Sequence, residues 1–219
     1  VKNVRLTPVV DGSGLKNTLE SHIVDTLVNE IDPQYATGKA FNTMGVDRYG
    51  MTLDFFNHGY EMVCGDLMFG LGIPIPIKSL RQLHWVAKLM LPIATRLPLE
   101  MIYPTGDKQD EIIPKFTKYY EWADVIIGDC HYIKRHMPDN LQGKLIATNT
   151  TTQQDLDMFR ERGVTHVVTT TPQLDGRSFG TNMMEAALTA VAGKNRPLTH
   201  EELAEMLTQL DMKPSVHKL

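Results

Sequence analysis

Short apolar runs alternate along the chain with segments whose apolar residues recur every three or four positions. The runs have the length and composition of strands and lie at residues 5–10, 39–44, 60–64, 125–127, 145–147 and 166–168. Helical spacing is clearest at Leu15, Leu19, Ile23, Leu27 and Ile31, which predicts one helix over residues 15–31. Further helices are predicted at residues 51–57, 79–90, 114–122, 154–162, 181–192 and 199–210.

This alternation predicts an α/β protein with a Rossmann-like, doubly wound and mostly parallel sheet that carries helices on both faces. Residues 39–219 form the expected nucleotide-binding domain, with a helical insertion at about 67–104. Residues 1–38 are expected to supply an N-terminal strand and a connecting helix, either as the remnant of an upstream domain or as the link to one. In such sheets ligands bind beyond the carboxyl ends of the strands, so we expect the binding site in the loops that follow the strands.

Composition narrows the classes of partner. A formal charge of −4 and a pI near 6.1 offer no positive field for nucleic acid. Glycine, proline, lysine and arginine interrupt the apolar stretch 67–104, so no bilayer-spanning helix is predicted. Cys64 and Cys130 are far apart in sequence and indicate reduced thiols in a cytoplasmic protein. We therefore expect a small-molecule substrate and neither a nucleic-acid nor a membrane partner.

The loop after residues 39–44 is the best candidate for a cofactor site. Gly45 and Gly50 let backbone approach a pyrophosphate, and the helix that follows offers N-terminal N–H groups. Asp47 would repel a phosphate unless Arg48 neutralises it. Asp66 follows the next strand and can accept a ribose hydroxyl. Strand-to-helix turns that contain glycine also occur as plain connectors, so the nucleotide interpretation has an ordinary alternative.

Other strand ends add further candidates. Asp129 and His131 follow the strand at 125–127 as possible contacts to the cofactor's edge, and Thr150 and Thr170 follow the next two strands. A zinc site is not expected, because adjacent residues such as Cys130 and His131 cannot all point at one ion and the other ligands are missing. A satisfied structural role is the alternative for His131, and helix capping is the alternative for the threonines.

The residues after the last predicted strand suggest a wall that binds an anion. Arg177, Ser178, Thr181 and Asn182 combine a guanidinium with hydroxyl and amide groups at the start of a helix. Lys16 follows the turn at 11–14 and is the candidate for proton transfer, although an exposed helix lysine is the commoner role for such a residue.

The order of elements resembles the shikimate and quinate dehydrogenase family over its nucleotide-binding domain. The segment Asn17-Thr18-Leu19-Glu20 resembles the Asn-Thr-acid motif of that family, and the helix from Met184 to Gly193 resembles its closing Gln-Ala-Ala helix, with Glu185 in place of glutamine. The run from residue 8 to residue 182 is also similar to bacterial proteins labelled quinate 5-dehydrogenase. The resemblance implies substrate contacts from Asn17 and Glu185.

The same resemblance implies an oxidoreductase that exchanges a hydride between NAD(P) and a polyhydroxylated cyclic acid. Gly65-Asp66-Leu67 replaces the family's Asn-Arg-Thr clamp for a 2′-phosphate, which favours NAD over NADP. The catalytic lysine of that family lies in a domain upstream of this region. We therefore expect either a homodimer or a partnership with a separate N-terminal catalytic domain. An S-adenosylmethionine-dependent transferase and a non-catalytic nucleotide-binding subunit remain as alternatives.

Overall fold

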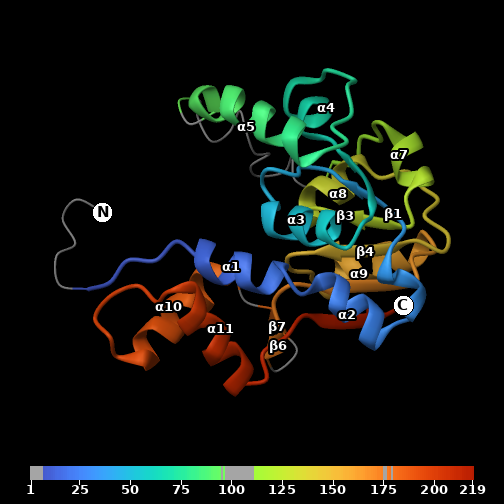
Figure 1. Ribbon diagram of the computed structural model, residues 1–219. Coiled ribbons are helices and arrows are strands. Elements are labelled where there is room, and N and C mark those ends of the chain that lie inside the picture. Colours follow the sequence, from blue (N-terminus) through green and yellow to red (C-terminus); the bar gives the residue numbers. More distant parts are fainter. Residues whose placement is uncertain (1–6, 95, 97–110, 175–176, 179) are drawn as a thin grey trace.

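The computed structural model describes residues 7–94, 96, 111–174, 177–178 and 180–219 (Figure 1). The strands are β1 (Lys39–Asn42), β2 (Glu61–Cys64), β3 (Val125–Ile127), β4 (Leu145–Thr148), β5 (His166–Thr169), β6 (Gln173–Leu174), β7 (Arg177–Ser178) and β8 (Ser215–Lys218). The helices are α1 (Ser13–Glu20), α2 (Ile23–Glu30), the 3-10 helix η1 (Pro33–Ala36), α3 (Tyr49–Asn57), α4 (Asp66–Leu71), α5 (Leu80–Ala94), α7 (Thr117–Trp122), α8 (Cys130–His136), α9 (Gln153–Glu161), α10 (Thr181–Ala192) and α11 (His200–Gln209).

Six strands form one mostly parallel sheet in the order β2-β1-β3-β4-β5-β8. The first five are parallel, and β8 pairs antiparallel with β5 at the edge. The chain winds outward from β1 in both directions, because β2 lies on one side of β1 and β3 on the other. The predicted α/β doubly wound architecture is therefore confirmed, and its switch point lies between β1 and β3.

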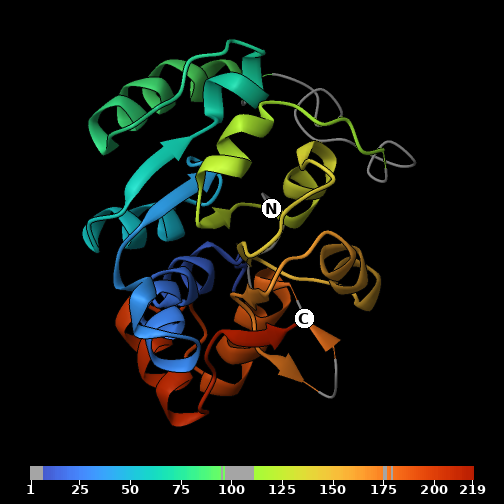
Figure 2. The ribbon, with the colours of Figure 1, turned by 90° about the vertical axis from the view of Figure 1, so that its right-hand side faces the viewer.

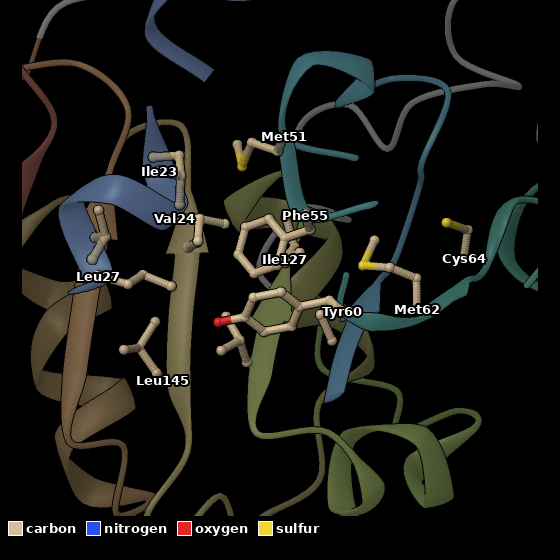
Figure 3. Close-up of a cluster of buried hydrophobic side chains, with 14 of the residues drawn as sticks. Ile23, Val24, Leu27, Met51, Phe55, Tyr60, Met62, Cys64, Ile127 and Leu145 are labelled. Atoms are coloured by element: carbon tan, nitrogen blue, oxygen red, sulfur yellow. The ribbon is translucent and has the colours of Figure 1, made fainter. Parts of the chain in front are cut away.

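Alternate residues of each strand sort into two cores, one on each face of the sheet. One core contains Ala40, Val125 and Leu145 and packs against α2, α3 and α5 (Figure 3). The other contains Phe41 and Ile126 and packs against α7, α8 and α9. Because both faces are covered, the strands read as continuous apolar runs, which explains why the sequence revealed them.

Three predicted elements differ from the structure, and some observed elements were not predicted. The helix expected at 15–31 is split at Ser21 and His22 into α1 and α2, and its apolar positions are buried except Ile31, which is partly buried. Residues 7–10 form no strand, and the rest of the strand expected at 5–10 lies outside the described residues. Helix α8 and strand β8 were not predicted, because neither has a sustained apolar period. Helix α5 continues past Pro92 to Ala94, beyond the predicted end at residue 90.

Helix α1 packs against α10 and α11 in a third cluster that includes Leu15, Leu19, Leu188 and Leu203. Figure 2 shows these helices together at one end of the molecule, with α4 and α5 at the other. The first helices of the chain are thus packed into the same body as the sheet. Among the described helices, none has the length and apolar character needed to cross a bilayer.

Asp54 of α3 joins α3 to the beginning of α2. Its Oδ2 accepts a hydrogen bond from the Val24 N–H at 2.9 Å, and its side chain is only 3% exposed. Burial raises the pKa of Asp54 to about 6, while the Val24 N–H and His58 act in the opposite direction. The folded protein therefore binds this proton more tightly than the unfolded chain, whose aspartate has a pKa of about 3.9.

We expect the stability contributed by the Asp54 proton to be complete below about pH 4 and lost as the pH rises to about 6. Asp54→Asn keeps a side-chain oxygen as the acceptor for the Val24 N–H, so this substitution removes only the titration. The unfolding free energy of the wild type minus that of the variant should fall by on the order of 2 kcal/mol across this window. Urea unfolding at a series of pH values measures it, and repeating the comparison with His58→Gln in both proteins controls for the neighbouring histidine. A difference that stays flat between these pH values contradicts the assignment.

Candidate functional site

The loops after β1 and β3 meet at the switch point. The Thr43 N–H continues the ladder by donating to the Ile127 carbonyl at 3.0 Å. Gly128 has a φ of +152°, and a Cβ placed on it would lie 2.1 Å from the Thr43 Oγ1. Only glycine allows this close approach of the two loops. The hydroxyl of Thr43 is buried and has no hydrogen-bond partner among the described residues.

Asp66 holds the glycine loop that follows β1. Its Oδ2 accepts the Gly45 N–H at 3.0 Å, and its Oδ1 accepts the Val46 N–H at 2.8 Å. Burial raises the pKa of this carboxyl, whereas the two N–H donors lower it. Asp66, which was predicted to bind a ribose hydroxyl, therefore accepts hydrogen bonds from backbone amides that were predicted to bind a pyrophosphate. Because Asp66 is only 2% exposed, a ligand reaches it only if the loop at 43–48 moves.

Arg48 is the centre of a buried charge network, which we call the carboxyl-edge network. Its Nη1 lies 3.2 Å from the Glu20 Oε1 of α1, and its Nη2 lies 2.6 Å from the Asp129 Oδ2 after β3. Its Nε lies 3.2 Å from the Asp47 Oδ2. Burial acts to lower the pKa of Arg48, but Asp47, Glu20 and Asp129 outweigh that effect and raise it. Burial also raises the pKa of Glu20.

The network continues across the next two strand ends. The Asn149 Nδ2 donates to the Asp129 Oδ2 at 3.0 Å, and the Asn149 carbonyl accepts the hydroxyls of Thr170 and Thr171 at 3.4 and 3.2 Å. Asp129 also caps α8 by accepting the His131 N–H at 3.0 Å. The structure therefore brings Arg48, Asp129 and Thr170 together, as the positions of their strands predict.

Thr150 and His131 lie at the margin of this network. Thr150 is half-buried, and the side chain of His131 is exposed. His131 helps to line a cavity of about 300 Å³ between α8 and α9, together with Lys134, Thr152 and Gln154. The described residues contain no group of three or more His, Cys, Asp or Glu side chains arranged to hold a metal ion.

Lys16 reaches the network from α1. Its Nζ donates a hydrogen bond to the Asp47 carbonyl oxygen and lies 3.6 Å from the Asp47 Oδ1. The side chains of Lys16 and Asp47 are 23% and 26% exposed, so this pair faces solvent above the buried Arg48. Lys16, the residue predicted for proton transfer, thus contacts Asp47, which was predicted to bind the cofactor and lies in the loop after β1.

Glu185 and Gly50 have packing roles in the structure. The Glu185 Oε2 accepts the Leu15 N–H at 2.8 Å and so caps the first turn of α1. A Cβ on Gly50 would lie 2.7 Å from the Glu20 Cβ, so glycine at this position lets α3 approach α1. These two residues help to set the position of α1, and their ligand contacts stay predictions.

Only some of the remaining residues predicted to bind substrate lie close to the turn at 11–14 and helix α1. A Cβ on Gly12 would lie 2.5 Å from the Asn182 backbone nitrogen, so the turn at 11–14 touches the start of α10. Asn182 and Asn17 are exposed, and Thr181 is half-buried. Arg177 and Ser178 form β7, but their side chains lie outside the described residues.

Glu20 and Asn149 belong to the carboxyl-edge network but were not among the predicted site residues. Lys16 and Glu20 are four residues apart, a spacing that places two side chains on the same face of a helix. That spacing was the available signal for Glu20. Asn149 carried a weaker signal, because it follows a predicted strand directly.

The fold and these contacts define an α/β domain with a doubly wound sheet and a charged switch point. The chain belongs to the family described as Domain of unknown function (DUF8754), whose model matches residues 14–219. No curated protein and no solved structure matches the chain.

We expect Arg48→Met to lower the free energy of unfolding by roughly 3–5 kcal/mol, because it leaves Glu20 and Asp129 buried without their cation. The loss should shrink at low pH, because burial raises the pKa of Glu20 and its carboxyl can then be protonated. The triple variant that adds Glu20→Gln and Asp129→Asn should recover part of the loss. Urea unfolding measures each value, with the exposed Arg160→Met as the matched control. A cost for Arg48→Met no larger than the control's argues against the network.

Proposed function

We propose that this domain binds NAD at the β1/β3 switch point and exchanges a hydride between NAD and a polyhydroxylated cyclic acid. The observation that carries the proposal is the pair formed by Lys16 and Asp47 at the carboxyl edge of the sheet. It combines an accessible proton-transfer group with the part of a doubly wound sheet where nucleotide cofactors bind. The resemblance to quinate and shikimate dehydrogenases supports the same reaction class.

The residues available to the cofactor fit NAD better than NADP. Asp66 would accept ribose hydroxyls and would repel a 2′-phosphate. Its present bonds to Gly45 and Val46 mean that cofactor binding requires the loop at 43–48 to shift. The buried Thr43 hydroxyl, which has no partner in the described part of the chain, offers one further contact. Arg48 would act mainly by holding the loop, because its guanidinium already faces three carboxylates.

Bound NAD would supply the hydride acceptor, and the protein would manage the proton. As the carbinol carbon of the substrate loses a hydride and its C–O bond becomes a ketone carbonyl, Lys16 in its uncharged form would take the hydroxyl proton. In the reverse direction charged Lys16 would return that proton. Asp47 would orient Lys16, and Arg177 and Asn182 would bind the carboxylate and hydroxyls of the substrate.

An S-adenosylmethionine-dependent transferase is the second candidate, and one observation favours it. The carboxylate of Asp66 occupies the amides of Gly45 and Val46, which a pyrophosphate would need. S-adenosylmethionine contains a ribose but no pyrophosphate, so it makes no demand on these amides. A subunit without catalysis of its own is the third candidate.

Thermal unfolding in the presence of NAD, NADP or S-adenosylmethionine separates the dehydrogenase from the transferase, and stabilisation by none of the three ligands favours the third candidate. We expect NAD to stabilise the protein by about 2.7 kcal/mol at a hundredfold its Kd, and NADP to do so much less. Asp66→Asn should weaken NAD binding at least roughly tenfold, because a hydrogen bond to a charged group is worth about 1.5–3 kcal/mol. The exposed Asp157→Asn is the control. Stabilisation by S-adenosylmethionine alone supports the transferase, and an unchanged affinity in Asp66→Asn removes the role of that residue.

Replacing Lys16 tests the chemistry apart from cofactor binding. We expect Lys16→Met to lower kcat for quinate- or shikimate-dependent NADH formation by about 10²–10⁴-fold, because general acid–base catalysis contributes that much. The Kd for NAD should stay within about twofold. Lys16→Arg keeps the charge and the contact with Asp47 but is a poor proton donor and acceptor, so it should recover little activity. NADH absorbance measures the rate. Full activity in Lys16→Met excludes the proposed proton transfer, and a wild type that binds NAD without oxidising either acid excludes these substrates.

A further inference from the structure

Large hydrophobic side chains are exposed together at the end of the molecule formed by α4 and α5. Five of the ten exposed large hydrophobics among the described residues lie within nineteen positions of the sequence. They are Leu71, Ile73, Ile75, Trp85 and Leu89, which we call the apolar end. Helices α4 and α5 lie at the same extremity of the molecule in both views (Figures 1 and 2). So many exposed apolar side chains at one end of the molecule indicate a binding face.

The outer face of α5 is both basic and apolar. Leu83 on its inner face is 1% exposed, whereas Trp85 and Leu89 on its outer face are 66% and 72% exposed. Arg81 and Lys88 are exposed beside them, and the Lys88 Nζ lies 5.7 Å from the centre of the Trp85 ring. The helix therefore presents tryptophan, leucine and cations on one exposed surface, which can contact apolar and anionic groups at the same time.

The charge of this segment is opposite to that of the rest of the chain. Residues 67–99 contain four basic residues, Lys78, Arg81, Lys88 and Arg96, and no aspartate or glutamate. Because the whole chain has a formal charge of −4, the remainder carries −8. The basic charge is thus confined to the segment that exposes the apolar side chains. Charge complementarity points to an anionic partner.

We propose that the apolar end docks on an anionic lipid surface, with α5 lying in the plane of the interface. In a two-fold dimer through this face, Arg81 and Lys88 would face the same basic residues of the second copy. The segment contains no acidic residue to neutralise them. A lipid surface instead offers headgroup phosphates to the cations and acyl chains to Trp85 and Leu89. The expectation of no membrane partner was based on spanning segments, and a helix in the interface meets a different requirement.

Vesicle co-sedimentation with the intact chain tests the proposal. We expect binding to phosphatidylcholine vesicles that contain about one third phosphatidylglycerol, weaker binding at high salt, and little binding to phosphatidylcholine alone. Arg81→Glu with Lys88→Glu should lower the partition coefficient by at least roughly 20-fold, since each basic residue near such a surface contributes about fivefold. Trp85→Ser with Leu89→Ser should lower the partition coefficient at least tenfold, because binding no longer transfers these two apolar side chains from water into the lipid.

Matched variants away from the apolar end are the controls. Lys115→Glu with Lys118→Glu makes the same change of net charge at exposed positions, and Val191→Ser removes another exposed apolar side chain. Both should bind vesicles like the wild type. Trp85 fluorescence should shift to shorter wavelength on binding, and Trp85→Phe, which leaves Trp122, should abolish the shift.

Two results overturn the proposal. The first is failure of the wild type to sediment with anionic vesicles, and the second is equal loss of binding in the control variants. If the wild type fails to bind vesicles and Trp85→Ser with Leu89→Ser forms a smaller oligomer by light scattering, the apolar end belongs instead to contacts between copies of the chain.

Discussion

The buried guanidinium of Arg48 is the interaction on which the carboxyl edge of this domain depends. It joins Glu20 of α1 to Asp129 after β3, and it extends from the loop that follows β1. Charges are costly to remove from water, so such a group persists only where its partners are held in place. Here three elements distant in sequence supply those partners. This network, together with the packing of α1 against α10 and α11, sets the position of α1 and with it that of Lys16.

A second constraint is the use of a side-chain carboxylate where many doubly wound domains bind a phosphate. The N–H groups of Gly45 and Val46 point at Asp66, which keeps the loop closed without any ligand. A backbone nest of this kind favours an anion, and the protein provides one from its own chain. If the domain binds NAD as proposed, binding would require a rearrangement of this loop. The apparent affinity would then be lowered by the fraction of molecules in the open state.

The surface of the molecule divides into two regions of different character. The end formed by α4 and α5 is apolar and basic, whereas the remainder carries the excess of acidic residues. Tyr49, next to Arg48, connects the two regions through a hydrogen bond of 2.9 Å to His84 of α5. This contact lies one residue from Arg48 in the chain, so α5 is joined to the element that carries the carboxyl-edge network.

The sequence by itself determined the α/β class, most strands and the limits of α10, because buried strands read as apolar runs and helices show their period and caps. It also placed Asp66, Arg48 and Asp129 at strand ends. Only the tertiary structure decided which of these groups meet, since a hydrogen bond depends on atoms brought together from elements far apart in the chain. Sequence could not show that Asp66 would bind the glycine loop, that Gly50 would serve helix packing, or that Glu20 would complete the network. It also missed β8, whose pairing comes from the exposed edge of β5 and not from a hydrophobic pattern of its own.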